Sequence, residues 1–116
     1  MIRCKRIYDG ADQDDGYRVL VDRLWPRGIK KTELRYDEWA RTLAPSTALR
    51  KALHGETIDF TEFSKRYREE LNETGDAALA LAKRARKETV TLLYGAKNTA
   101  QNHALVLADF LRQLKN

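Results

Sequence analysis

Three segments of the chain carry the apolar pattern of β-strands. Apolar and charged positions alternate, imperfectly, over residues 2–8, and residues 17–22 read YRVLVD, with three apolar residues in a row. Residues 89–94 are β-branched and apolar, and a glycine follows them. Alternation is typical of a half-buried strand, whereas an unbroken apolar run is typical of a strand buried on both faces, as in a sheet covered by helices. The pattern predicts two strands near the start of the chain and one near its end.

Between and after these strands, apolar residues recur at intervals of three and four, the spacing of one helix face. Short helices are predicted over 47–53 and 77–86. Two longer apolar stripes consist of Phe60, Phe63, Tyr67 and Leu71, and of Ala104, Leu107, Leu111 and Leu114. Ser46 is a suitable N-cap for the first helix, and Asp59 with Glu62 has the spacing of a capping box for the second.

This order of elements predicts a single α/β domain over residues 1–116, with a small, mostly parallel sheet covered by helices. The segment 29–45 has the least regular pattern, and residues 37–43 fit either a helix or a strand. The loops are clearer: Asp9–Gly16 is rich in turn formers, and Pro26 with Gly28 ends the strand pattern after residue 22.

Charge and composition narrow the functional classes. The chain has 22 Lys and Arg against 17 Asp and Glu, which gives a net charge of +5. The excess is spread evenly over both halves, without a basic arm of the kind that duplex-binding proteins often carry. No apolar run approaches the ~20 residues of a membrane span, and no apolar stretch follows the charged N-terminus as in a secretion signal. The single cysteine favours a reducing cytoplasm, so we expect a cytoplasmic protein without a membrane partner.

Several familiar motifs are absent. The chain has no GxGxxG, GxxxxGK[ST], GxSxG or HExxH, and its two histidines have no cluster of Cys or Asp beside them, so we expect neither a cofactor nor a metal. The Asp-rich loop fails the EF-hand spacing, because Ala11 and Gln13 fall where that motif needs acids. Cys4 lies early in a strand without a Gly-rich turn after it, which favours a small buried thiol over a nucleophile.

Polar segments follow two of the predicted strands. The first delivers Asp22, Arg23, Trp25 and Arg27. The second delivers Lys97, Asn98, Asn102 and His103 and leads into a helix N-terminus. Ligands of open α/β sheets bind beyond the carboxyl ends of strands, and a helix N-terminus with nearby cations favours phosphate or carboxylate. We therefore predict that these residues form an anion site.

Each residue also has a purely structural interpretation. Arg23 could pair with an acid, Trp25 could fill the core, and Asn98 could cap the last helix. His103 could donate a hydrogen bond to a carbonyl. The coincidence of these residue types at two strand ends is what favours a site. Within it, Asp22 and His103 form the one plausible acid–base pair, and a helix N-terminus favours the neutral imidazole.

Three stretches together resemble a known family. DGYRVLVDRLWPRG, APSTALRKALHG and TLLYGAKNTAQNHALVLADFL, in this order, are similar to the bacterial YeaO-like proteins, the short branch of the family named domain of unknown function 488. The resemblance covers nearly the whole chain and implies a compact α/β domain without an assigned activity. It also implies that Ser46, Arg50 and His54, which lie in the second of these stretches, are close to the site. Longer members carry a Cys-His-Arg triplet where this chain has Asn102-His103-Ala104, so thiol chemistry of that branch does not transfer.

The sequence thus predicts a protein that binds a phosphate- or carboxylate-bearing small molecule such as a nucleotide. Whether the protein also converts this molecule stays open. Asp22 and His103 are the catalytic candidates, and the predicted ligand-binding residues are Arg23, Trp25, Arg27, Lys97, Asn98, Asn102, Ser46 and Arg50. The alternative is a nucleic-acid-binding or regulatory protein, in which Trp25 between two arginines stacks on a base. A homodimer or an interface within a complex also stays open.

Overall fold

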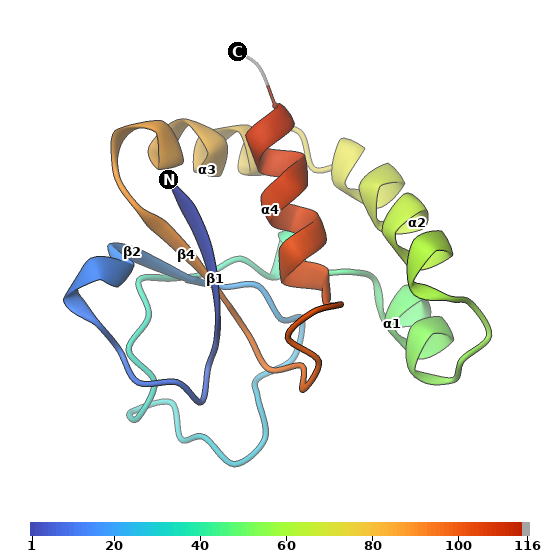
Figure 1. Cartoon of the computed structure of the whole chain (residues 1–116), viewed down its shortest axis with the longest axis horizontal. Coiled ribbons are helices and arrows are strands. Elements are labelled where there is room, and N and C mark those ends of the chain that lie inside the picture. Colours follow the sequence, from blue (N-terminus) through green and yellow to red (C-terminus); the bar gives the residue numbers. More distant parts are fainter. Residues whose placement is uncertain (115–116) are drawn as a thin grey trace.

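The computed structural model describes residues 1–114, whose strands form one parallel sheet (Figure 1). The strands are β1 (Ile2–Arg6), β2 (Tyr17–Leu20), β3 (Glu38–Trp39) and β4 (Val90–Tyr94). Their order in the sheet is β1-β4-β2-β3, and every neighbouring pair is parallel. The three predicted strands are confirmed, each slightly shorter than its apolar pattern. Because β4 lies between β1 and β2, the segments that follow β2 and β4 leave the sheet side by side.

The helices are α1 (Thr47–His54), α2 (Phe60–Asn72), α3 (Asp76–Lys87) and α4 (His103–Gln113). The side chain of Ser46 accepts a hydrogen bond from the Leu49 amide, and that of Asp59 accepts one from the Glu62 amide. Both residues are therefore the N-caps that the sequence predicts. Leu114 follows α4 as its C-cap rather than belonging to the helix, yet it still packs against the core.

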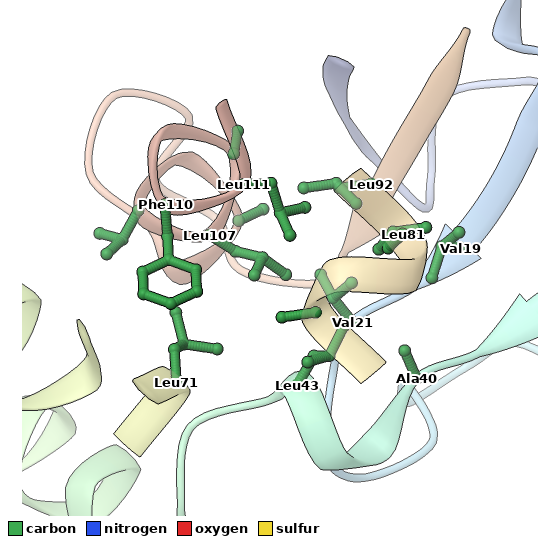
Figure 2. Packing of buried hydrophobic residues seen from close by; sticks show 14 of the residues in the cluster. Val19, Val21, Ala40, Leu43, Leu71, Leu81, Leu92, Leu107, Phe110 and Leu111 are labelled. Atoms are coloured by element: carbon green, nitrogen blue, oxygen red, sulfur yellow. The ribbon is translucent and has the colours of Figure 1, made fainter. Parts of the chain in front are cut away.

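Helices α1 to α4 and one face of the sheet enclose the main core. Alternate strand residues, among them Val19 and Leu92, point into it and meet the apolar stripes of α2, α3 and α4, and α1 adds the buried Leu49. Figure 2 shows Leu107 and Leu111 of α4 beside Leu92, with Phe110 turned towards Leu71 of α2. This burial of apolar surface is the dominant stabilising contribution to such a fold.

The opposite face of the sheet is covered differently from the prediction. Leu20 and Leu93 are fully buried there, but their cover is the irregular chain between β2 and β3, including Leu34 and Trp25. The unbroken apolar run of β2 did indicate burial on both faces. It could not show that, within the described residues, the helices of the main core pack on one face and loops cover the other. A short 3-10 helix, η1 (Gln13–Asp15), completes this second layer.

The segment 29–45 resolves into two short elements. Residues 37–43, predicted as helix or strand, contain both the two-residue strand β3 and the 3-10 helix η2 (Arg41–Leu43). The strand is held by backbone bonds from the Asp37 amide to the Arg18 carbonyl and from the Ala40 amide to the Leu20 carbonyl. Since these partners lie about twenty residues earlier, no local pattern reveals the pairing.

Candidate functional site

A cleft lies where the chain leaves the carboxyl ends of β2 and β4. Its volume is about 780 Å³, within the range of ~300–1,000 Å³ typical of small-molecule sites. The segments 22–27 and 95–103 form its sheet side, and residues of α1, of α2 and of the loop between these helices form the other. Figure 1 shows α1 and the start of α2 standing apart from the sheet, with the chain that leads into α4 between them and the strands. Two distant sequence segments thus line one cavity.

An aspartate and a histidine join these two segments. Asp22 Oδ1 lies 2.8 Å from His103 Nε2, and Asp22 Oδ2 accepts a hydrogen bond of 2.9 Å from the Gly95 amide. A Cβ at position 95 would lie 2.8 Å from that Oδ2, so glycine permits the close approach of carboxylate and backbone. The contact between Oδ1 and Nε2 is short but not aligned as a hydrogen bond. Both atoms are shielded from water and have no other partner among the described residues.

Two asparagines shape the chain before His103. Asn98 Oδ1 accepts bonds from the amides of Ala100 and Gln101, which closes a tight turn. Asn102 is buried, donates from its side chain to the Asn98 carbonyl, and caps α4 by accepting from the Leu105 amide. These bonds give both asparagines structural roles, and they place His103 in the first turn of α4. The backbone amide of His103 has no partner within the helix and faces none outside it among residues 1–114.

Four cationic side chains line the cleft: Arg23, Arg27, Arg50 and Lys97. None of them has a carboxylate within 4.0 Å among the described residues. Asp22 and Glu56 are the acids in the lining, so the cations exceed the anions by two. The cleft is therefore electropositive, and its low-dielectric walls strengthen that potential.

Arg23 is the cation with fixed geometry. Its Nε donates to the Pro45 carbonyl at 2.9 Å, and one terminal nitrogen donates to the Ala44 carbonyl at 3.2 Å. Carbonyl partners hold the guanidinium without neutralising it, and its remaining donors have no partner within residues 1–114, which leaves them to a ligand. Arg50 is half-buried on the cleft side of α1, although the sequence suggests an exposed helix position.

Trp25 and Ser46 serve the fold more than the cleft. The Trp25 indole donates to the Ile29 carbonyl and packs edge-on against Tyr36 and Trp39, while the residue still contributes to the lining. Ser46 caps α1, and its hydroxyl donates to Glu70 at 2.6 Å, outside the cleft lining. Capping α1 and bonding Glu70 therefore account for the Ser46 side chain without a role in ligand binding.

An apolar wall lies on the side of the cleft opposite Arg23, Arg27 and Lys97, and sequence reasoning missed it. It consists of Leu53, Ile58, Phe60 and Phe63 from α1, α2 and the loop between them. The rings of Phe60 and Phe63 stack with centroids 5.7 Å apart. The spacing of these phenylalanines does indicate a core-facing stripe, and Phe63 is indeed buried. Only the half-buried Phe60, at the start of α2, signals that the stripe extends beyond the core to a cavity.

Two titratable groups of the main core and its edge are held in their neutral forms. Burial, followed by the charges of Glu70 and Asp22, raises the pKa of Tyr67 well above its ordinary value. Burial also raises the pKa of the Cys4 thiol to about 11, and this thiol donates a weak hydrogen bond to the Ala104 carbonyl. Cys4 is thus a half-buried structural residue under α4, not a nucleophile of the site.

Comparisons with known proteins place the chain in a family. All residues 1–116 match the family described as the inactive DUF488-N3 subclade. The chain belongs to this subclade. It is 60% identical over 113 residues to the uncharacterized protein YeaO of Escherichia coli, an alignment that covers 97% of this chain and 98% of YeaO. It is 44% identical over 111 residues to the uncharacterized proteins Rv3073c of Mycobacterium tuberculosis and Mb3100c of Mycobacterium bovis, covering 95% of this chain and 92% of each relative.

The match to the subclade confirms the predicted resemblance to the YeaO-like branch. No solved structure is similar to the chain. Within residues 1–114, no cluster of three or more potential metal ligands occurs, and no helix has the length and apolar character needed to cross a membrane.

Proposed function

We propose that this DUF488-N3 protein binds a small molecule that carries a phosphate or carboxylate group and an apolar body, such as a nucleotide. The observation that carries the proposal is the set of cationic side chains that face one cleft without carboxylate partners. An Arg in such a setting gains charge-assisted hydrogen bonds when an anion enters. The apolar wall, opposite Arg23, Arg27 and Lys97, would receive the body of the ligand, for instance a base stacked on Phe60.

Binding without turnover agrees best with the family. The subclade is described as inactive, and the longer-branch cysteine is absent from the position before His103. Asp22 and His103 then contribute to ligand recognition rather than to a reaction. The described lining also offers no Cys as a nucleophile beside this pair.

The nucleic-acid alternative has weaker support. Trp25, the residue expected to stack on a base, instead packs against Tyr36 and Trp39, and the face of Trp39 is covered by the Arg41 guanidinium at 3.7 Å. A cleft of about 780 Å³ also has the size that a small molecule fills.

Thermal-shift and calorimetric titrations with AMP and with inorganic phosphate test the proposal. A ligand at 100 times its Kd stabilises the folded state by ~2.7 kcal/mol, which raises the melting temperature. The double variant R27A/K97A removes two exposed cleft cations that carry little of the fold, and we expect at least tenfold weaker AMP binding, since a charge-assisted bond contributes ~1.5–3 kcal/mol.

The matched control is K83A/K87A, which removes the same charge from the exposed face of α3. It should bind AMP as the unaltered chain does. Equal weakening in both double variants, or no AMP or phosphate binding at millimolar concentration, would refute the anion site. Binding of a single-stranded oligonucleotide that falls steeply between ~50 and 200 mM salt, without AMP binding, would favour the alternative.

A further inference from the structure

The contact between Asp22 and His103 fixes which ring nitrogen carries the proton. Asp22 Oδ1 and His103 Nε2 lie 2.8 Å apart, both shielded from water and without other partners in residues 1–114. Two bare lone pairs at this separation would repel each other in a buried site. A proton on Nε2 removes the repulsion, and a small ring rotation would align it with the carboxylate. Neutral His103 therefore carries its proton on Nε2.

This assignment leaves the other ring nitrogen as an acceptor. Neutral imidazole has one donor and one acceptor nitrogen, so Nδ1 of His103 has a free lone pair. No hydrogen bond to Nδ1 exists within the described residues, and Nδ1 is not among the buried, unpartnered atoms as Nε2 is. The His103 side chain keeps 15% of its surface exposed, and the residue lines the cleft. Nδ1 is thus an acceptor open to a ligand.

We infer that His103 Nδ1 accepts a hydrogen bond from a hydroxyl group of the bound anion, so that the ligand is a hydroxylated phosphate or carboxylate, with a ribonucleoside 5′-monophosphate as the best-fitting class. The inference rests on the proposed function and specifies the ligand. The cations of the cleft act as donors alone, because Arg and Lys cannot accept. Both Asp22 oxygens are occupied, by the Gly95 amide and by His103. His103 Nδ1 is then a fixed side-chain acceptor that the sheet side of the cleft offers to a sugar hydroxyl.

The Asp22→Asn variant should exchange the roles of the two His103 ring nitrogens, so that the donor becomes the acceptor. The side-chain oxygen that it introduces would keep the bond from the Gly95 amide, and the new NH₂ group would face His103 Nε2. An NH₂ group only donates, so Nε2 would become the acceptor and the proton would move to Nδ1. His103 would then present a donor to the cleft, with almost no change in the shape of the site.

The first measurement needs no ligand. Long-range ¹H–¹⁵N correlation spectra above pH 8 distinguish a protonated ring nitrogen from a bare one for each histidine. We expect the Nε2–H form of His103 in the unaltered chain and the Nδ1–H form in Asp22→Asn. The control Asp109→Asn, at an exposed carboxylate on α4, should leave the first pattern unchanged. An Nδ1–H form in the unaltered chain would overturn the inference without affecting the proposed anion site.

The second measurement compares two ligands by calorimetry. AMP and 2′,3′-dideoxy-AMP share the base and the phosphate and differ in the ribose hydroxyls. We expect the unaltered chain and Asp109→Asn to prefer AMP about tenfold, the effect of roughly one hydrogen bond with a partner otherwise left unsatisfied. The variant His103→Phe keeps an aromatic ring but has no acceptor nitrogen, so it should retain the fold by its melting temperature and lose most of the preference for AMP.

The outcomes separate the two proposals. Equal binding of AMP and the dideoxy compound by the unaltered chain overturns the hydroxyl contact and leaves the anion site standing. Failure of both compounds and of inorganic phosphate to bind overturns the site and this inference together. A preference for AMP that persists in His103→Phe also overturns the assignment to His103.

Discussion

Asp15 is a buried carboxylate on which the loop-covered face of the sheet depends, and its removal should destabilise the protein strongly. Its side chain is fully buried, contacts the Arg18 guanidinium, lies 3.2 Å from Lys5 Nζ, and accepts a 3.0 Å bond from the Asp12 amide. Arg18 is itself 2% exposed. Asp15→Asn would leave the Arg18 charge buried without its counter-ion, a change that typically costs ~3–5 kcal/mol.

That loss is large beside the whole stability of the domain. At ~0.05–0.15 kcal/mol per residue, a chain of 116 residues is stable by roughly 6–17 kcal/mol. Urea unfolding followed by circular dichroism should therefore show a clear fall in the midpoint for Asp15→Asn. The neighbouring Asp14→Asn is the matched control, because Asp14 is exposed and its carboxylate makes no ion pair within residues 1–114, so a change within ~0.5 kcal/mol is expected.

The pH dependence of the same pair gives a second test. Burial alone would raise the pKa of Asp15, but the bonds from the Asp12 amide, Lys5 and Arg18 outweigh it and lower the pKa below its ordinary value. A lowered folded-state pKa contributes stability that is complete above the unfolded-state pKa of ~3.9 and is lost as pH falls through the folded-state value.

The difference in unfolding free energy between the unaltered chain and Asp15→Asn should accordingly be constant above pH ~5 and shrink as pH falls below ~4. A destabilisation under ~1 kcal/mol at pH 7 would refute the reasoning about the buried charge. A difference that grows on acidification would refute the sign of the shift.

Three further predictions concern single positions. Gly16→Ala should destabilise the domain by at least ~2 kcal/mol in urea unfolding, since φ is +63° and a Cβ would lie 2.3 Å from the Thr89 carbonyl oxygen. The Cys4 thiol, with its pKa raised from 9.0 to about 11, should react with a disulfide reagent at pH 8 about 100-fold more slowly in the folded than in the urea-unfolded chain; equal rates would contradict its burial. Gly95→Ala should displace Asp22 and alter the His103 ring-nitrogen shifts, and an unchanged spectrum would contradict the packing of the pair.

Local signals in the sequence determined much of the fold. Alternation specified the half-buried β1, and apolar runs specified β2 and β4, because a strand buried on both faces of a parallel sheet is apolar along its length. Ser46 and Asp59 specified two helix starts, because only a side-chain acceptor satisfies the first free amides. The sequence also indicated that the segments after β2 and β4 belong together, since parallel strands end at one edge.

Only the tertiary structure decided the rest. The strand order that puts β4 beside β2, the pairing of β3 and the apolar wall around Phe60 all depend on contacts between residues far apart in the chain. The same holds for the contact of Asp22 with His103, eighty-one positions later, which sets the proton on one ring nitrogen. The type of a residue determines which bonds it can make, whereas packing over the whole chain determines its partners. The bond from Ser46 to Glu70 is an example, because it exists only in the folded molecule.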